Sequence, residues 1–336
     1  MIFPRRMFLM LSYADSGVFR TGSAHVFSPE WEYSLMTNDT VRDMIWETIR
    51  SEAAEGVWRE PMLSSFLHSS ILSHKTLEDA LCFVLAHKLE SVTLPALSLR
   101  DLMEEAHQAD PELGACARAD IEAVRQRDPA CRMYSQPLLY FKGYLSLQAY
   151  RIAHHYWNQD RIHLALFLQS RISERFAVDI HPAAKIGRGV FIDHATGEVI
   201  GETAVVEDNV SMLHAVTLGG TGKEWGDRHP KVRHGVLIAA GAKILGNIEI
   251  GEGAKIAAGA VVLKSVPAHA TVAGVPARRI GMETSDQPAL DMNQQIGDSA
   301  VCAPPCNCPI DTCKRETMPR CMFPNGSEEE GQEAVR

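Results

Sequence analysis

Residues 238–262 read IAAGAKILGNIEIGEGAKIAAGAVV, and a large aliphatic residue opens each group of six. The same spacing extends back along the chain, where a two-residue slip and a polar interruption divide it into blocks. A period of six matches neither the 3.6-residue helix nor the two-residue strand. It is typical of a solenoid with three short faces per coil. The aliphatic positions are Ile180, Ile186 and Ile192; Ile200, Val206, Met212 and Leu218; and Ile238, Ile244, Ile250, Ile256 and Val262.

Glycines occupy positions between these aliphatic residues. Gly187, Gly189, Gly241 and Gly253 suit corners where a Cβ would clash or φ must be positive. Such a prism has flat outer walls, so identical chains can pack side by side and form clefts between them. The alternative is a β-sandwich in which the six-residue spacing arose by chance.

The preceding residues, 38–177, carry the pattern of an all-α domain. Asn38, Asp39 and Thr40 provide N-cap side chains before apolar residues with helical spacing. The predicted helices span residues 61–74, 76–88, 97–108, 111–126, 137–159 and 162–176, and proline begins several of them. We therefore predict an α+β chain, in which an N-terminal all-α domain (38–177) precedes a parallel β-helix of hexapeptide repeats (178–282).

Composition argues against several classes of partner. The 336 residues carry a formal net charge of -9, which disfavours nucleic acid and anionic membrane surfaces as main partners. No apolar run is long enough to span a bilayer. Cys82, Cys116 and Cys131 are scattered through helical sequence rather than spaced as a disulfide framework. The composition predicts a reduced, cytoplasmic protein.

The two ends of the chain lack the periodicity of the domains. Residues 1–37 begin with an arginine-bearing apolar run, which is either an organellar targeting signal or a loosely packed extension; its acidic residues weigh against targeting. Residues 283–336 form a polar tail whose cysteine spacing fits a zinc or redox cluster poorly, so we expect a flexible tail with loose thiols. The tail cysteines are Cys302, Cys306, Cys308, Cys313 and Cys321.

Two polar segments interrupt the repeat. The first, Asp193-His194-Ala195-Thr196-Gly197, directly precedes the two-residue slip, which predicts a bulge in the coil wall at a carboxylate and a histidine. The second runs from Gly219 to Pro230 and is long enough to reach a neighbouring subunit. It offers an arginine for a carboxylate, Arg228, and a second histidine, His229.

A histidine suits the removal of a proton from an alcohol when a carboxylate or carbonyl fixes its tautomer. Asp179 precedes His194 by somewhat less than one coil of about eighteen residues, so it is a candidate for that role. On spacing alone, His194 and His229 are equally well explained as ordinary surface histidines of a solenoid.

A set of short motifs runs through both domains. They are EPML (60–63), RDPA (127–130), SQPLL (135–139), QAYRI (148–152), VDIHPAAKIG (178–187), DHATG (193–197), GET (201–203), TLGGTG (217–222), DRHP (227–230) and GVPAR (274–278). Together they resemble the serine O-acetyltransferases of cysteine biosynthesis, over roughly residues 43–295. Related hexapeptide acyltransferases share the repeat but lack the helical domain and the DRHP loop.

This resemblance implies a left-handed parallel β-helix that forms a homotrimer, with trimers often paired through the helical domains as a dimer of trimers. It implies active sites between adjacent β-helices, with acetyl-CoA along the groove and L-serine at its inner end. The implied reaction is direct attack of the serine hydroxyl on acetyl-CoA in a ternary complex, giving O-acetyl-L-serine and CoA. No metal is implied. Inhibition by L-cysteine is implied, in association with the region near residues 285–295.

The same motifs imply residue roles. His194 corresponds to the general base on the serine hydroxyl, with Asp179 orienting its ring and His229 close by as a second polar histidine. The residues implied to bind L-serine are Arg228 at its carboxylate, and Asp128 and Asp193 at its ammonium group. The residues implied to contact acetyl-CoA are Gly220, Thr221, Ala240, Lys255 and Ala258.

The chain also departs from the family's pattern. Many bacterial relatives end in an isoleucine that inserts into O-acetylserine sulfhydrylase. This chain ends Ala334-Val335-Arg336, which puts that complex in doubt. The extension at 1–37 and the cysteine-rich tail have no counterpart in the family.

Two other functions stay open at this point. A zinc enzyme like the γ-carbonic anhydrases would use histidines of the same solenoid. A non-catalytic trimeric scaffold would keep the fold with a dead site. The candidate zinc ligands are His181, His194, His214 and His229.

Overall fold

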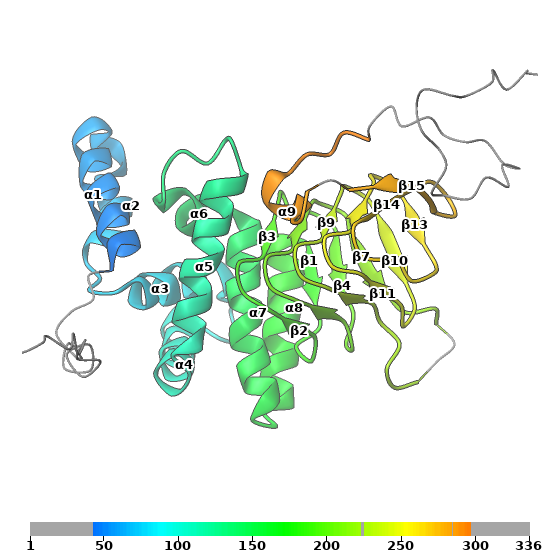
Figure 1. The fold of residues 1–336 in the computed structure, drawn as a ribbon. Coiled ribbons are helices and arrows are strands. Elements are labelled where there is room, and N and C mark those ends of the chain that lie inside the picture. Colours follow the sequence, from blue (N-terminus) through cyan, green and yellow to red (C-terminus); the bar gives the residue numbers. More distant parts are fainter. Residues whose placement is uncertain (1–42, 223–224, 284, 297–336) are drawn as a thin grey trace, which may run out of the picture. The chain divides into compact units, whose positions relative to one another are not determined.

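The computed structural model describes residues 43–222, 225–283 and 285–296. Expectations about the extension at 1–37, the five tail cysteines and the terminal Ala334-Val335-Arg336 concern residues outside these ranges. Within them, a helical region is followed by a parallel β-helix, as Figure 1 shows. This arrangement confirms the predicted fold class.

The helical region extends from α1 (Met44–Arg59) to α8 (Ile162–Phe176). After α1 the chain winds through short 3-10, α and π turns, and then forms longer helices. Thr76 caps α3, because its hydroxyl accepts a hydrogen bond from the N–H of Asp79. The intervening elements are η2 (Pro61–Leu63), α2 (Ser64–Leu67), η3 (His68–Leu72), α3 (Leu77–Leu89), α4 (Ala96–Ala109), α5 (Glu112–Arg127), α6 (Ser135–Tyr140) and α7 (Lys142–Asn158).

The prediction of one helix over residues 137–159 is wrong. Phe141 has extended backbone angles and separates α6 from α7. The reason is tertiary: α7 begins directly against the β-helix, where a Cβ added to Gly143 would lie 2.0 Å from the carbonyl oxygen of Ile192. A continuous helix across residue 141 would not present Gly143 to the coil in this way.

The β-helix has three walls. Wall A has the order β1-β4-β7-β10-β13, wall B the order β11-β8-β5-β2, and wall C the order β15-β14-β12-β9-β6-β3. All neighbours are parallel except β14 and β15. Wall A comprises β1 (Val178–Ile180), β4 (Glu198–Ile200), β7 (Thr217–Gly219), β10 (Lys243–Leu245) and β13 (Val261–Val262); wall B comprises β2 (Lys185–Ile186), β5 (Val205–Val206), β8 (Lys231–Val232) and β11 (Glu249–Ile250); wall C comprises β3 (Phe191–Ile192), β6 (Ser211–Met212), β9 (Leu237–Ile238), β12 (Lys255–Ile256), β14 (Ala270–Ala273) and β15 (Arg278–Met282).

The predicted aliphatic positions form the interior of this prism. Each lies in a strand, and all are buried except Ile186, which is partly buried. The repeat resumes one step earlier than predicted, at Val232 in β8. Each buried aliphatic side chain stabilises the fold by about 1.5–3 kcal/mol relative to exposure.

The two-residue slip enlarges a single turn. Ile180 pairs with Ile200, whereas Ile200 pairs with Leu218, so the first of these coils holds two more residues than the second. Because Ile192 pairs with Met212, the extra residues fall between β3 and β4, in the turn that carries His194. The predicted bulge is therefore present, and a uniform coil of eighteen residues is wrong for this coil.

A buried ion pair joins the helices to the β-helix. The carboxylate of Asp120 in α5 lies 2.8 Å from the guanidinium of Arg151 in α7, and both side chains are almost fully buried. Asp120 also accepts hydrogen bonds from the side chain of Gln148 and from the N–H of Val190. Arg151 donates to the carbonyl oxygens of Ile186 and Gly187. The two regions therefore share one polar network.

The C-terminal part of the described chain returns to wall C. The short helix α9 (Pro288–Asp291) lies beside β9 and α5, and the hydroxyl of Ser211 donates to the carbonyl oxygen of Ala289 at 2.8 Å. Among the helices of the described ranges, none combines the length and the apolar character needed to cross a bilayer.

Candidate active site

A cavity of about 360 Å³ lies where the helical region meets the β-helix. Its walls come from the C-terminal end of α5, the junction of α6 with α7, and the turn after β3. We call it the junction cavity. It contains three of the predicted site residues, Asp128, Asp193 and His194. The other lining residues are Val124, Ala130, Tyr140, Phe141, Lys142, Gly143, Tyr144, Phe191 and Ile192.

Two carboxylates give the junction cavity a negative character. Asp128 is the C-cap of α5, at the negative end of the helix dipole. Burial raises the pKa of Asp193, and the charge of Asp128 raises it further, against the opposing effects of His194 and His214. Two carboxylates that line one cavity are stabilised by a cation placed between them. The cavity is therefore suited to an ammonium group.

Arg127, next to Asp128 in the RDPA motif, anchors the end of α5 to the β-helix, a role that the sequence alone did not predict. Its guanidinium donates to the hydroxyl of Ser211 at 3.1 Å and to the side-chain oxygen of Asn209 at 3.2 Å. Burial lowers the pKa of Arg127 to about 10. The end of α5 is thereby tied to the β-helix directly beside the junction cavity.

His194 projects from a strained turn. His194 and Ala195 both have left-handed backbone angles, with φ of 56° and 54°. The ring is 76% exposed; its Nε2 lies 3.6 Å from Oδ1 of Asp193, and its centroid is 5.9 Å from that of His214, edge to face. Left-handed non-glycine residues persist only where the surrounding structure fixes them, and they are concentrated at functional sites.

Asp179 does not contact His194 in this structure. It lies in β1, and its Oδ1 accepts a hydrogen bond from the side chain of Gln169 in α8 at 2.8 Å. The carboxylate beside His194 is that of Asp193. The predicted role of Asp179 in orienting the imidazole therefore stays a prediction.

Arg228 and His229 form a second cluster, at the corner between walls A and B. The guanidinium of Arg228 pairs with Glu202 at 2.6 Å. The Thr203 hydroxyl accepts hydrogen bonds from the N–H groups of both Arg228 and His229. We call this set the loop cluster. A Cβ at Gly201 would lie 2.1 Å from the ring of His229, so only glycine admits this packing.

The hydrogen bonds of His229 fix its tautomer. The N–H of Thr203 donates to Nδ1 at 3.1 Å, so Nδ1 is an acceptor and Nε2 carries the proton of the neutral ring. Burial lowers the pKa of His229, and the charge of Arg228 lowers it further. His229 is therefore a neutral donor at neutral pH.

The residues predicted to contact acetyl-CoA divide between the same two corners. Ala240 lies two residues after the last residue of β9, and Ala258 two residues after the last residue of β12, just as His194 lies two residues after β3. The three residues therefore occupy equivalent positions, stacked along the corner between walls C and A. Gly220 and Thr221 follow β7, at the corner of the loop cluster. One chain thus presents two half-sites separated by wall A.

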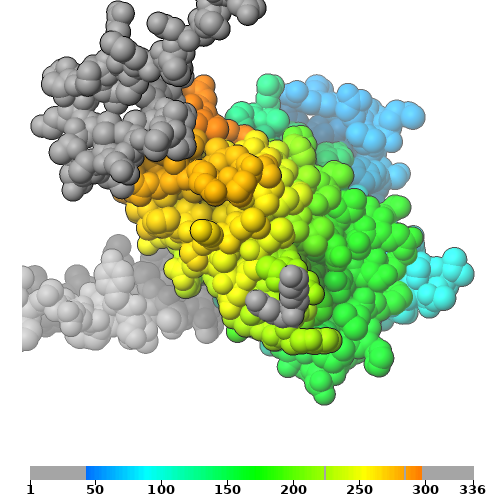
Figure 2. All heavy atoms as spheres, turned by 90° about the vertical axis from the view of Figure 1, so that its right-hand side faces the viewer, coloured from blue at the N-terminus to red at the C-terminus, as the bar shows by residue number. Residues whose placement is uncertain are grey.

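Lys255 differs from these four residues. Its side chain is buried, its ammonium group lies 3.1 Å from the carboxylate of Glu283, and it donates to the carbonyl oxygen of Gln295 at 2.8 Å. Figure 2 shows the end of the prism, where the orange C-terminal strand lies over the yellow coils. In this conformation the C-terminal segment covers Lys255, and no surface is left for a ligand at its ammonium group.

The four candidate zinc ligands, His181, His194, His214 and His229, also lie at two different corners of the β-helix. His194 and His214 stack at one corner, whereas His181 lies near Glu202 and Arg228 of the loop cluster. In the ranges that the structure describes, no group of three or more His, Cys, Asp or Glu side chains is placed to bind a metal ion.

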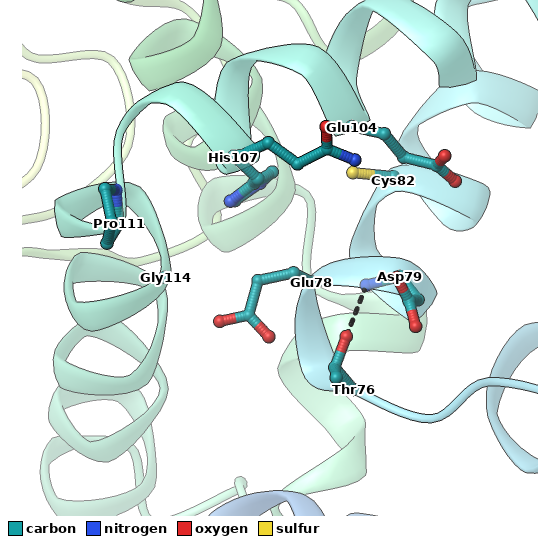
Figure 3. Close-up of a pocket in the computed structure, with 9 residues that line it drawn as sticks. Thr76, Glu78, Asp79, Cys82, Glu104, His107, Pro111 and Gly114 are labelled. Carbon is teal, nitrogen blue, oxygen red and sulfur yellow. Dashed lines mark hydrogen bonds between the residues drawn. The ribbon is translucent and has the colours of Figure 1, made fainter. Parts of the chain in front are cut away.

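A separate cavity of about 310 Å³ lies among α3, α4 and α5 (Figure 3). Both ring nitrogens of His107 are buried there without a hydrogen-bond partner, and burial lowers the pKa of this histidine. Glu78 projects into the same space from α3. The walls of this cavity hold no residue of the junction cavity or of the loop cluster.

Comparison with known proteins explains the combination of helices, β-helix and clusters. The family described as "Serine acetyltransferase, N-terminal" matches residues 45–149, and that described as "Bacterial transferase hexapeptide (six repeats)" matches residues 229–264. The serine acetyltransferase of Escherichia coli (strain K12) is 60% identical over 254 residues, which cover 76% of this chain and 93% of that protein. This chain belongs to the serine acetyltransferase family. It is therefore an acyltransferase, and the family resemblance drawn from the motifs is confirmed.

Solved serine acetyltransferases share the fold. A structure described as a complex with cysteine is 59% identical, with a TM-score of 0.74, and the match covers 75% of this chain and 98% of that one. The enzyme of Brucella abortus strain S19, in complex with coenzyme A, is 54% identical, with a TM-score of 0.71 and coverage of 72% and 97%. These comparisons favour the acetyltransferase over the zinc enzyme and the scaffold.

Proposed function

We propose that this serine acetyltransferase binds L-serine in the junction cavity and transfers to it the acetyl group of acetyl-CoA. The observation that carries the proposal is the convergence of Asp128, Asp193 and His194 on one cavity. The serine oxygen forms a bond to the acetyl carbon, the thioester bond breaks, and CoA leaves as the thiol. A thioester carbonyl is reactive enough for direct attack, so no covalent enzyme intermediate is needed.

The ammonium group of serine lies between Asp128 and Asp193 in this proposal. Both carboxylates occur in the junction cavity, and charge-assisted hydrogen bonds to an ammonium group relieve their mutual repulsion. The walls around them include the aromatic side chains of Phe141 and Phe191. The two carboxylates favour a ligand that carries an ammonium group, such as an α-amino acid.

His194 acts as the general base. Its exposed imidazole borders the cavity, where it can accept the hydroxyl proton as the oxygen attacks, which contributes about 10²–10⁴-fold to the rate. Asp179 is the carboxylate that we propose to orient the His194 ring once an ammonium group engages Asp193. Gln169 bonds Oδ1 of Asp179, so that its other oxygen remains for the ring.

Arg228 binds the serine carboxylate, and His229 donates a hydrogen bond from Nε2 to a ligand oxygen. The guanidinium has donors beyond the one bonded to Glu202, so it can engage a second carboxylate. Since the loop cluster lies across wall A from the junction cavity, we infer that a neighbouring chain supplies Arg228 and His229. The site then lies between two copies of the chain.

Acetyl-CoA lies along the groove that the two copies form. Ala240 and Ala258 give the His194 corner a smooth surface, and Gly220 and Thr221 border the facing corner. A relative solved in complex with coenzyme A supports acetyl-CoA as the acyl donor. L-cysteine has the same ammonium and carboxylate groups as L-serine, so we propose that it occupies the same pocket as an inhibitor, in line with the cysteine complex of a relative.

Three protomers related by a threefold axis would complete three such sites. The outer end of the helical region then joins trimers in pairs, because several large apolar side chains are exposed there. Measurement of the mass in solution distinguishes a trimer from a dimer of trimers. These exposed residues are Trp58, Met62, Leu63 and Phe66.

The proposed reaction is tested by following CoA release from acetyl-CoA with and without L-serine. We expect release that depends on serine, and L-cysteine at micromolar to millimolar concentration should raise the KM for serine without changing kcat. CoA release at the same rate with and without L-serine would contradict the proposal. Stoichiometric zinc that stays bound after chelation, together with hydration of CO₂ by the protein, would also contradict it. Activity without cysteine inhibition would contradict only the regulatory part.

A further inference from the structure

A buried glutamate lies at the base of the turn that carries His194. Glu198 begins β4, directly after Gly197, and its side chain is only 1% exposed. One carboxyl oxygen accepts a hydrogen bond from the N–H of Val216 at 3.1 Å, and the other is buried with no partner. Burying a carboxyl group with so few bonds costs free energy, and an apolar side chain would avoid that cost.

The hydrogen bond from the N–H of Val216 to Glu198 takes the place of a backbone hydrogen bond that is found in the regular coils. Before β10, the N–H of Ala242 closes its own turn by donating to the carbonyl oxygen of Ala239, and the next coil repeats this bond before β13. Val216 holds the same place before β7, but its N–H crosses to the side chain of Glu198 in the preceding coil. Glu198 thus supplies the acceptor at the point where the enlarged turn disturbs the stacking of coils.

This bond connects two histidine-bearing turns. The N–H of Glu198 donates to the carbonyl oxygen of Ala195, within the turn of His194. Its carboxyl oxygen bonds the N–H of Val216, two residues after His214. The turn of His214 also has a left-handed residue, Ala215, with φ of 59°. Both strained turns therefore depend on a residue that touches neither a ligand nor an imidazole.

We propose that Glu198 is a positioning residue for acetyl transfer, which ties the turn of His194 to the turn of His214 and so fixes the direction of the His194 ring. The inference rests on the proposed function, because it takes His194 as the base. Glu198 acts through the backbone of the turn and makes no contact with the substrate.

Burial favours the uncharged form of this carboxyl group. Burial raises the pKa of Glu198 well above its ordinary value, against the opposing effects of the Val216 N–H and of Lys243. Lys243 is the charged side chain that acts on it, and its ammonium group is bonded to the carbonyl oxygen of Ala215. Glutamine has the size of the uncharged acid and keeps an oxygen acceptor for Val216.

The first experiment compares Glu198→Gln with Glu198→Leu in the full chain. Leucine removes the acceptor, so kcat for serine should fall about tenfold or more per folded protein, and the acidic limb of the pH profile of kcat/KM should move because the environment of His194 changes. Glutamine should restore kcat to within about twofold of the wild-type value. A purely structural residue would lower the yield of folded protein without moving the pH profile.

The second experiment follows thermal unfolding against pH. Since the folded pKa is raised above the unfolded value of about 4.3, the contribution of Glu198 to stability is complete below that value and is lost as pH rises towards the folded pKa. Glutamine does not ionise, so the Glu198→Gln variant does not lose stability in this way as pH rises. Its unfolding midpoint should therefore exceed that of the wild type by roughly 3 °C or more at pH 8, and the difference should shrink towards pH 5. A difference that does not depend on pH contradicts the raised pKa of Glu198 and the preference for its uncharged form, whereas the kinetic comparison of the leucine and glutamine variants decides the positioning role.

Controls separate this inference from the proposed function. Glu252→Leu, at an exposed corner of the same β-helix, should leave kcat and its pH profile unchanged. If His194→Ala is inactive while Glu198→Leu keeps the wild-type kcat and profile, only the inference fails. An active His194→Ala removes the proposed role of His194 as the base. If Glu198→Leu does not fold, a kcat for Glu198→Gln reduced tenfold still overturns the inference.

Discussion

Replacing His194 with alanine is expected to lower kcat for serine-dependent CoA release at least about a hundredfold. The serine hydroxyl is a weak nucleophile at neutral pH, and the His194 imidazole, which lines the junction cavity, is the proposed base. Because Asp128 and Asp193 stay in place, the KM for serine should change little. The effect should therefore appear in kcat.

His163→Ala provides the matched control for this prediction. His163 is an exposed histidine of α8, away from both clusters, so its loss should leave kcat within about twofold of the wild-type value. If His194→Ala retains more than about a tenth of the wild-type kcat while folded, His194 is not the general base.

Replacing Asp120 with alanine should have the largest effect on stability. The change leaves the buried guanidinium of Arg151 without its counter-ion, and it removes the acceptor of the Val190 N–H and of Gln148. Breaking one partner of a buried pair costs about 3–5 kcal/mol. For a chain of this size, that loss lowers the unfolding midpoint by roughly 10 °C.

An exposed ion pair serves as the control for Asp120. Glu105 pairs with Arg161 at 2.9 Å, and both side chains are about half exposed, so Glu105→Ala should cost less than about 1 kcal/mol. Replacing both Asp120 and Arg151 with apolar residues should cost less than Asp120→Ala, because no buried charge is left alone. Equal unfolding midpoints for Asp120→Ala and Glu105→Ala would contradict the assigned role of the pair.

The β-helix could be predicted from sequence because its repeat is local. Each coil buries residues such as Ile244 and Ile256 at a fixed spacing, and the small residues between them suit corners, so the pattern does not depend on distant contacts. The helical region was predictable for a similar reason. Its break at Phe141 was not, because it depends on the packing of Gly143 against a residue about fifty positions away.

The site was predictable only in part. The slip in the repeat located the turn of His194, and the motifs added Asp128 and Asp193, which the structure places in the same cavity. Spacing suggested Asp179 as the partner of His194 on the assumption of a uniform coil, whereas the enlarged turn changes the stacking there. The role of Glu198 could not be predicted from sequence, because a glutamate beside a turn is usually exposed. In the structure Glu198 is buried next to the enlarged turn.

The motifs implied a site between adjacent β-helices, but residue types alone could not assign His194 and His229 to different corners of the prism. Sequence reasoning grouped His194 with His229, but within one chain they stand at different corners of the prism, one beside the junction cavity and one over Gly201. The proposed cooperation of His194 with His229 therefore requires a second copy of the chain.

In the proposed assembly, each active site contains His194 from one protomer and Arg228 from the neighbouring protomer. The direct test mixes two inactive variants, His194→Ala and Arg228→Ala, after dissociation and reassembly. Random mixed trimers restore both residues at about a quarter of the interfaces, so activity near a quarter of the wild-type value should return. If differently tagged chains co-purify as mixed trimers and activity stays at the level of the parents, His194 and Arg228 come from the same protomer, and the proposed site is wrong.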